Sequence, residues 1–165
     1  MDVTETVGNA LRWIIGILDR HNIQYQITGG FAAKLYGSSR EVNDIDIDIC
    51  EKDFQTILPY ISHYLIDGPT HYNDGKWDGE FITINYRGQY IDISAIDSLR
   101  ITNKERTEWL PYQQSYFESL DIEVNGMKLN ILSPRKLVQY KKELDGEHQL
   151  IDIQAIEKYC IEHGL

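Results

Sequence analysis

The chain has 165 residues, of which 42% are hydrophobic and 25% are charged. This length suits one globular domain with a substantial buried core. No apolar run is long enough to cross a bilayer and the first residues are acidic, so we expect a cytoplasmic protein with no membrane partner. The net charge of −10 disfavours generic DNA binding, because the chain repels a phosphate backbone, whereas a nucleotide carried with Mg²⁺ stays compatible with it.

Helices and strands alternate in the first part of the chain. Apolar residues at helical spacing predict the first helix, and the Gly29-Gly30 pair separates a weak strand from a short second helix. Pro59 lies inside the third helical pattern, where we expect a kink or an end. The elements expected here are a helix up to about Asn22, a strand over 23–28, a helix over 31–36, a strand over 44–50 and a helix over 54–61.

Hairpins dominate the middle of the chain, and helices follow them. Residues 67–79 are rich in Gly, Asp, Asn and Pro, which predicts a mobile loop. This order of elements favours an α+β domain with a mixed sheet over a doubly wound parallel sheet. The elements expected here are a hairpin of 81–86 with 89–94, a hairpin of 120–124 with 127–132 about Asn125-Gly126, a helix opened by Ser133-Pro134, and a final helix from about Gln149.

The strand over 44–50 carries the first chemical signal. Asp44, Asp46 and Asp48 share one face because successive side chains of a strand alternate. Three neighbouring carboxylates repel one another and are relieved by solvent, by basic partners or by a cation. Their hard oxygen atoms suit Mg²⁺ or Mn²⁺. A solvated acidic strand face is the alternative for this run taken alone.

Two further features strengthen the metal interpretation. Asp92 stands between two isoleucines on another predicted strand, and it can complete a site of three carboxylates if that strand lies beside the first. Asp97 is a weaker rival because it lies beyond the strand. Gly29 and Gly30 stand at a strand-to-helix junction, where the backbone can approach a phosphate closely. A pair of glycines alone is more often only a turn.

These motifs together resemble the DNA polymerase β-type nucleotidyltransferase superfamily. Within it, the chain is similar to small bacterial lincosamide and aminoglycoside nucleotidyltransferases and to toxin–antitoxin nucleotidyltransferases, in which an Arg lies four residues before the first Asp. The C-terminal Ser133-Pro134-Arg135-Lys136-Leu137, Lys141 and Asp152 also resemble their closing helices. The resemblance rests on Thr28-Gly29-Gly30-Phe31-Ala32, Tyr36-Gly37-Ser38-Ser39-Arg40, Asp44-Ile45-Asp46-Ile47 and Ile91-Asp92-Ile93.

The resemblance implies a nucleotidyltransferase fold and a role for each matching residue. Asp44 and Asp46 would bind the metal ions, and Asp92 would join them and help to activate the acceptor hydroxyl. Arg40 contacts phosphate or is a structural partner of the acids, and Lys141 reaches a phosphate or covers the core with its stem. The sequence departs from the family pattern at two places. Gly30 stands where Ser is common, and His148-Gln149 stands where a Lys-Asp pair often opens the last helix. The implied nucleotide-binding residues are Thr28, Gly29, Gly30, Ser39 and Arg40.

The implied activity is transfer of a nucleoside monophosphate from an NTP, expected to be ATP, to an acceptor hydroxyl with release of pyrophosphate. Mg²⁺ or Mn²⁺ would be the cofactor. A catalytically idle nucleotide- or protein-binding module on the same fold, such as an antitoxin or regulator, is the alternative. We expect one domain over 1–165, with a catalytic core over about 1–98 and the hairpin and C-terminal helices over about 99–165.

The acceptor is open at this level. A small molecule, a protein or an RNA end would each supply a hydroxyl, and the charge of −10 favours a small cationic acceptor over RNA. A toxin or a second copy of the chain is a candidate protein partner. Residues proposed to line the acceptor pocket, with core or surface packing as the alternative, are His71, Tyr72, Trp77 and Asp78 of the 67–79 segment and Trp109-Leu110-Pro111-Tyr112.

Overall fold

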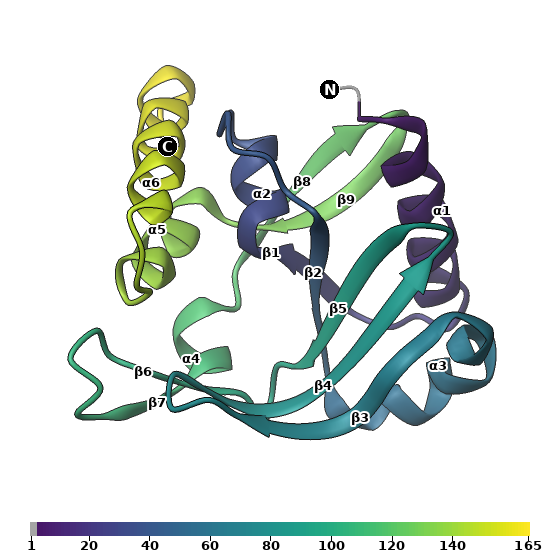
Figure 1. Cartoon of the computed structure of the whole chain (residues 1–165). Helices are drawn as coiled ribbons and strands as arrows, with labels where there is room; N and C mark the ends of the chain where they lie inside the picture. Colours follow the sequence, from purple (N-terminus) through teal and green to yellow (C-terminus); the bar gives the residue numbers. More distant parts are fainter. Residues whose placement is uncertain (1–2) are drawn as a thin grey trace.

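The computed structural model describes residues 3–165, except for the side chains of Gln114 and Ser115. Across these residues nine strands form one mixed sheet in the order β7-β6-β4-β5-β2-β1-β9-β8, with β3 paired to β4 (Figure 1). The strands are β1 (Tyr25–Thr28), β2 (Asp44–Ile49), β3 (Leu65–Asn73), β4 (Trp77–Tyr86), β5 (Gln89–Ala95), β6 (Arg100–Thr102), β7 (Trp109–Pro111), β8 (Ser119–Val124) and β9 (Met127–Leu132).

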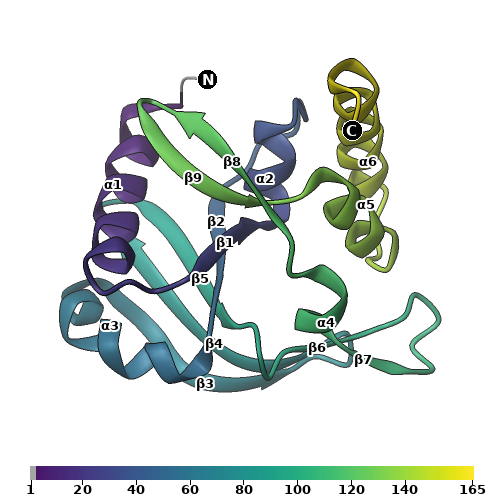
Figure 2. The ribbon, with the colours of Figure 1, turned by 180° about the vertical axis from the view of Figure 1, so that it is seen from behind.

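The helices gather in two groups, which are seen from opposite sides in Figures 1 and 2. One group contains α1, which contacts α3 and β5, and the other contains α2, which contacts α5 and α6. No helix of the described residues has both the length and the apolar character needed to span a membrane. The helices are α1 (Glu5–Arg20), α2 (Gly29–Leu35), α3 (Phe54–Ile61), α4 (Tyr112–Tyr116), α5 (Pro134–Lys142) and α6 (His148–His163), with short 3₁₀ turns at Glu51–Asp53 and Ser62–Tyr64.

Strand β2 at the centre of the sheet is fixed by its isoleucines. Ile45, Ile47 and Ile49 are almost fully buried, as are Ile91 and Ile93 of the neighbouring β5. Because the isoleucines alternate with the aspartates, anchoring one face in the core places the aspartates on the other. The mixed α+β architecture predicted from the sequence is confirmed, and it holds the acidic strand rigidly between two neighbours.

The prediction of a mobile loop over residues 67–79 is wrong. Most of this segment is strand, because β3 runs to Asn73 and β4 begins at Trp77. The pairing of β3 with β4 shifts register on both sides of Asp67, and this irregularity accommodates Gly68-Pro69. Gly68 has φ +98°, and a Cβ atom there would collide with the backbone of Phe81. The glycine and proline that suggested a loop therefore mark an irregular strand.

The other predicted elements lie close to their expected positions. Both hairpins form, and the Ser133 Oγ accepts a hydrogen bond from the Lys136 N–H at 3.4 Å as the cap of α5. Helix α3 continues through Pro59 to Ile61. Besides β3, the elements that the sequence pattern did not reveal are the short strands β6 and β7 and the helix α4, which together occupy part of residues 100–116. They bring the Tyr112 hydroxyl within 3.3 Å of the Thr28 hydroxyl at the end of β1, the neighbour of the acidic strand.

Candidate active site

One row of polar side chains crosses four adjacent strands of the sheet. Thr28 of β1 is the register partner of Asp46 on β2, and Asp46 is in turn the partner of Asp92 on β5. Thr83 of β4 is the partner of Asp92 on its other side. Side chains of directly paired residues on adjacent strands lie on the same face of a sheet. The fold therefore places these four groups side by side, with Asp46 and Asp92 in the middle.

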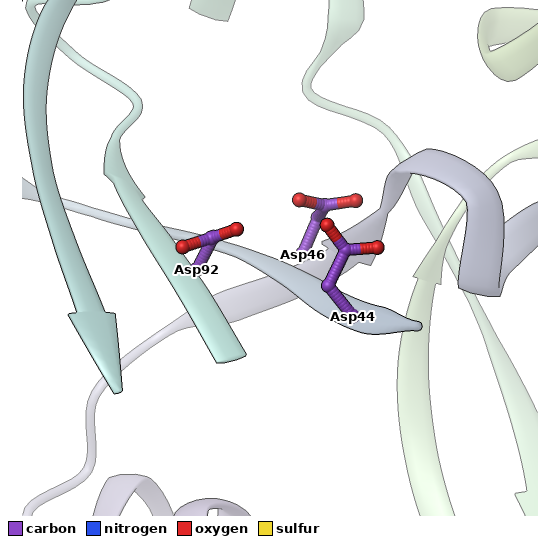
Figure 3. Close-up of side chains that lie close together, drawn as sticks. All are labelled: Asp44, Asp46 and Asp92. Carbon is purple, nitrogen blue, oxygen red and sulfur yellow. The ribbon is translucent and has the colours of Figure 1, made fainter. Parts of the chain in front are cut away.

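The central aspartates form a cluster of three carboxylates with Asp44, which precedes Asp46 by one full strand repeat. One carboxylate oxygen from each of Asp44, Asp46 and Asp92 lies within 4.8 Å of the others, and all three side chains are partly buried (Figure 3). The structure thus brings together the three acids singled out from the sequence. An all-oxygen donor set at such spacing is suited to Mg²⁺ or Mn²⁺. The assignment of these residues as metal ligands stays a prediction.

The acids are crowded enough to disturb one another electrostatically. Burial raises the pKa of Asp46 well above its usual range, and the negative charges of Asp44 and Asp92 add to the effect. Burial also raises the pKa of Asp92, although the Thr83 hydroxyl donates a 2.7 Å hydrogen bond that favours its ionised form. Ionising both Asp46 and Asp92 is therefore unfavourable in the protein alone, and a bound cation would relieve the repulsion.

Asp48 differs from the other two aspartates of its strand. Its side chain is 1% exposed, and the Gln26 Nε2 donates a 2.8 Å hydrogen bond to it. Burial raises the pKa of Asp48 to about 7, against the opposing hydrogen bonds from Gln26, Ser94 and Tyr112. A solvated acidic face therefore does not describe this strand, and the cluster of three carboxylates excludes Asp48.

The Gly29-Gly30 pair is closely approached by two charged side chains. Gly29 has φ +66°, and a Cβ atom there would overlap the Asp46 carboxylate. A Cβ atom on Gly30 would lie 2.7 Å from the Arg40 Nη2. Both glycines therefore make room for charged side chains, one for an acid of the cluster and one for a guanidinium. A backbone of only two residues separates the acidic cluster from Arg40.

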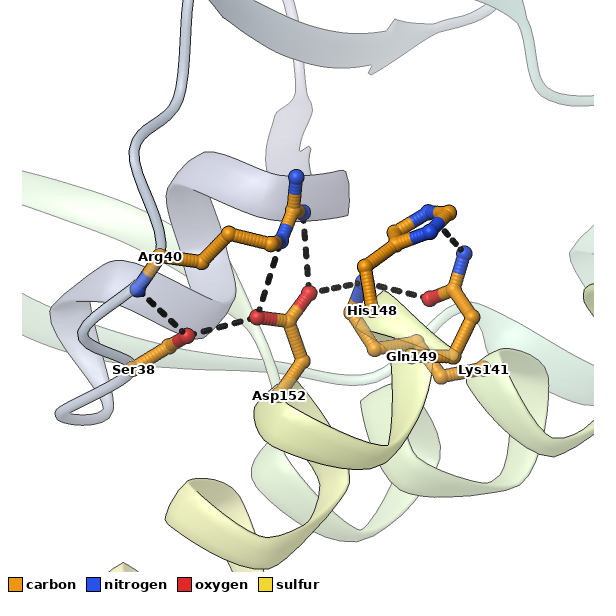
Figure 4. Close-up of polar contacts among 6 residues, drawn as sticks. All are labelled: Ser38, Arg40, Lys141, His148, Gln149 and Asp152. Atoms are coloured by element: carbon orange, nitrogen blue, oxygen red, sulfur yellow. Dashed lines mark hydrogen bonds and ion pairs between the residues drawn. The ribbon is translucent and has the colours of Figure 1, made fainter. Parts of the chain in front are cut away.

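Arg40 belongs to a second polar group centred on Asp152 of α6 (Figure 4). The Arg40 Nε and Nη2 donate to the two oxygens of Asp152 at 3.2 and 2.9 Å. The Lys141 Nζ donates to Asp152 at 2.8 Å and to Gln149 at 3.2 Å, and Ser38 donates to Asp152 at 2.6 Å. These contacts connect α5 and α6 to the loop that carries Ser38 and Arg40.

The contacts also bear on the candidate roles of three predicted residues. Arg40 is paired with an acid of α6, while its side chain keeps 28% of its surface exposed. Lys141 is 2% exposed and its ammonium is bound within the Asp152 group. Ser39 is exposed on the loop before Arg40, whereas the hydroxyl of its neighbour Ser38 is buried against Asp152. Nucleotide contact by Ser39 and Arg40 stays a prediction.

A cavity of about 480 Å³ opens beside the acids. Asp46 and Asp92 line it together with Asp67, and aromatic side chains form much of its remaining wall. Its volume is within the range of small-molecule sites. The aromatic residues of the wall are Tyr72, Trp77, Phe81, Tyr112 and Tyr140.

The residues proposed from the sequence for an acceptor pocket divide into two sets. Tyr72, Trp77 and Tyr112 line the cavity. His71 and Asp78 instead pair with each other, with 2.8 Å between the His71 Nε2 and a carboxylate oxygen of Asp78, and are not among the lining residues. The lining also does not include Trp109, Leu110 and Pro111 of β7. Tyr72 and Trp77 of the 67–79 segment therefore line the cavity, whereas its histidine does not, and their contact with an acceptor stays a prediction.

Two neighbours of the acids were missed in the sequence. The position of Thr83 beside Asp92 could have been found from the hairpin about Arg87-Gly88, because counting residues back from that turn pairs Thr83 with Asp92. Tyr140 comes from α5 and is brought to the cavity by helix packing, for which the local sequence offers no signal.

The comparisons with known proteins agree with this geometry. A family model described as aminoglycoside-2''-adenylyltransferase matches residues 10–156. A nucleotidyltransferase structure (TM1012) from Thermotoga maritima is similar with 23% identity, a TM-score of 0.65 and 94% coverage of each chain. The lincomycin-bound lincosamide adenylyltransferase LnuA is similar with 17% identity, a TM-score of 0.62 and coverage of 96% of this chain and 99% of that one.

A third solved structure is ANT(2'')-Ia in complex with adenylyl-2''-tobramycin. It shares 16% identity with this chain at a TM-score of 0.60, and the match covers 96% of this chain and 90% of that one. At these identities the structural likeness establishes the fold. No curated protein matches the chain.

Proposed function

The chain belongs to the aminoglycoside-2''-adenylyltransferase family and is a nucleotidyltransferase enzyme, and from this premise we propose that it transfers an adenylyl group from ATP to a hydroxyl of a small cationic acceptor. The observation that carries the proposal is the convergence of Asp44, Asp46 and Asp92, two of which (Asp46 and Asp92) line a cavity of small-molecule size. Three carboxylates at this spacing fit divalent cations, and the adjoining cavity gives an acceptor direct access to them.

The reaction assigns a separate task to each group. The acceptor oxygen attacks the α-phosphorus of ATP, the bond from that phosphorus to the pyrophosphate oxygen breaks, and pyrophosphate leaves. We assign Asp44, Asp46 and Asp92 to hold divalent cations, which when bound supply charge neutralisation at the transferred phosphate. Asp92 also orients the acceptor hydroxyl and accepts its proton. The Thr83 hydroxyl fixes the Asp92 carboxylate through the 2.7 Å hydrogen bond.

The nucleotide is assigned to the side of the cluster formed by Thr28, Gly29 and Gly30. Gly29 packs directly against Asp46, so a phosphate held at this backbone would lie next to the acids and their cations. Ser39 and Arg40 would extend the contact along the triphosphate. Positioning of this kind supplies most of the catalysis in phosphoryl-type transfers, because the chemistry needs alignment and charge neutralisation rather than a covalent partner.

The wall of the cavity supports a cationic acceptor. The carboxyl groups of Asp46, Asp48, Asp67 and Asp92 line it, and its lining among the described residues contains no Lys, Arg or His. Aromatic faces such as that of Trp77 attract cations and also pack against sugar or hydrocarbon rings. An amine-bearing ring compound with a free hydroxyl therefore fits better than a polyanionic RNA end.

The test is a transfer screen with ATP labelled at the α-phosphate. Acceptors would include amine-bearing antibiotics such as tobramycin and lincomycin, a protein panel and RNA ends, each with Mg²⁺ and with the Asp44→Asn variant as control. We expect label on an amine-bearing small molecule and none with the variant. Equal labelling by the folded Asp44→Asn protein would refute the assignment of these acids to the reaction. Tight ATP binding without transfer to any acceptor would favour an idle nucleotide-binding module.

A further inference from the structure

Asp152 of α6 is a single carboxylate that serves two cations. It is fully buried, and its two oxygens accept four hydrogen bonds, two from Arg40 and one each from Lys141 and Ser38 (Figure 4). The buried group of two cations and one anion therefore carries one positive charge in excess. Asp44 acts electrostatically on Arg40 and Asp46 acts on Lys141, so this positive charge faces the acidic cluster.

The geometry of Arg40 shows where that excess charge lies. Lys141 is enclosed at 2% exposure, whereas the Arg40 side chain is 28% exposed, so Arg40 presents the charge to a ligand. Its Nη2 packs against Gly30, and a Cβ atom there would lie only 2.7 Å away. The neighbouring Gly29 packs against Asp46. The guanidinium and the Asp46 carboxylate thus contact neighbouring glycines at the start of α2, and Asp44 lies close enough to act on the charge of Arg40.

Asp152 fixes the position of the Arg40 guanidinium as well as neutralising part of its charge. The carboxylate meets Arg40 through two parallel hydrogen bonds, a geometry that sets the plane of a guanidinium as well as its position. Those bonds use two of the five N–H groups of the side chain, which leaves capacity to bind phosphate oxygens. Lys141 and Ser38 in turn lock the Asp152 carboxylate. The chain of contacts runs from the buried helix pair to a cation near the proposed nucleotide site.

We propose that Asp152 is a positioning residue that holds Arg40 against the pyrophosphate portion of ATP. This inference rests on the proposed adenylyl transfer. The acids and their cations serve the transferred phosphate next to Asp46, and the leaving pyrophosphate needs a cation of its own, which the contact of Arg40 with Gly30 places at the same glycine pair. Arg40 supplies that cation, and Asp152 restricts it to a bound-like orientation before ATP arrives, which lowers the ordering cost of binding.

A purely structural tie between α6 and the Arg40 loop gives different expectations. In that case loss of Asp152 would lower thermal stability and the active fraction, but the affinity for ATP per folded molecule would not change. A positioning role makes the loss specific for ligands that carry the β- and γ-phosphates. It also makes the loss depend on Arg40, because Asp152 acts through that side chain.

The experiment measures the binding of α,β-methylene-ATP and of AMP, each with Mg²⁺, to the full chain. The variants are Asp152→Asn, Arg40→Gln and the double variant, with Asp145→Asn and Arg106→Gln as matched controls because that Arg–Asp pair is exposed. We expect each single variant to weaken binding of the ATP analogue about tenfold, with AMP binding unchanged. The double variant should bind no more weakly than Arg40→Gln alone, since the two residues form one unit.

Removing Asp152 alone leaves Lys141 as an unpaired buried cation, which can prevent folding. The comparison is therefore repeated in a Lys141→Gln background, where Asp152→Asn creates no such charge and the same tenfold loss is expected. Unchanged binding of the ATP analogue by folded Asp152 variants, or equal losses with and without Arg40, would overturn the positioning role. Failure of the wild-type chain to bind the analogue at all would instead overturn the proposed function together with this inference.

Discussion

Asp46 and Asp92 lie directly opposite each other on the parallel strands β2 and β5. Two carboxylates in register on one face repel each other, and the raised pKa of each, caused first by burial, shows how poorly the site tolerates their ionisation. A stable fold does not need this pair. Its presence at a cavity is the arrangement expected of a site that trades stability for cation binding.

Asp46→Asn should therefore stabilise the metal-free protein while it abolishes adenylyl transfer. Neutralising the central acid removes its repulsion with Asp44 and Asp92, and we expect a gain of roughly 0.2–1 kcal/mol in the free energy of unfolding at neutral pH. Urea unfolding in EDTA measures this gain. A less stable variant would mean that the Asp46 carboxylate makes a stabilising contact in the metal-free state.

The same variant separates metal binding from other effects of divalent ions. Mg²⁺ or Mn²⁺ should raise the melting temperature of the wild-type chain, because a ligand that binds only the folded state stabilises it. The increase should be absent in Asp46→Asn and retained in Asp121→Asn, whose carboxylate pairs with Lys128 on the surface of the β8–β9 hairpin. Equal increases in the two variants would argue against a cation site at the three acids.

Asp92→Asn should reduce kcat about 10²- to 10⁴-fold, the usual contribution of a positioned general base, and leave the fold intact. Thr83→Val is the companion variant, because it removes the 2.7 Å hydrogen bond that fixes Asp92 but leaves the carboxylate in place. We expect a smaller loss of kcat in Thr83→Val, with the KM for ATP unchanged in it. Single-turnover rates with labelled ATP measure both. A kcat within twofold of wild type in Asp92→Asn would remove Asp92 from the mechanism.

The alternation of aspartates with isoleucines explains why the acidic site could be predicted from the sequence. Asp44, Asp46 and Asp92 alternate with isoleucines, so the core determines their face, and the remaining question of which strands are neighbours was answered by the resemblance. The prediction for residues 67–79 was wrong because Gly68-Pro69 is typical of a loop, although an irregular strand paired to β4 tolerates both residues. Local composition cannot distinguish these two cases.

The Asp152 group could not be predicted in the same way. Arg40 and Asp152 are separated by 112 residues, and their pairing depends on how α6 packs against α2 and α5. Sequence spacing alone left two roles open for Arg40. The structure adds the bidentate contact and the close approach to Gly30, which no periodicity contains.

The charge of the cavity wall gives a prediction for the acceptor. Asp67 is exposed on β3 and lines the cavity two strands from Asp92, outside the cluster of three acids, so it can attract an amine without serving as a proposed metal ligand. Asp67→Asn should raise the KM for a cationic acceptor about 5- to 20-fold, an effect that shrinks with added salt, and leave the KM for ATP unchanged. Asp121→Asn serves as the surface control. An equal change in both KM values would place Asp67 outside the acceptor site.

The pH dependence of stability should reveal the ionised state of Asp152. Burial alone would raise the pKa of this carboxyl, but hydrogen bonds from Arg40, Lys141 and Ser38 lower it below its usual value. A carboxyl with a lowered pKa in the folded state stabilises the protein above its unfolded pKa of about 3.9, and this stabilisation is lost as the pH falls through the folded value. The wild-type chain should therefore exceed Asp152→Asn in unfolding free energy by about 3–5 kcal/mol at pH 7.

Urea unfolding of both proteins from pH 7 to pH 3 should show this difference shrinking only below about pH 4. A difference that stays constant to pH 3 would mean that Asp152 contributes by packing rather than by its charge.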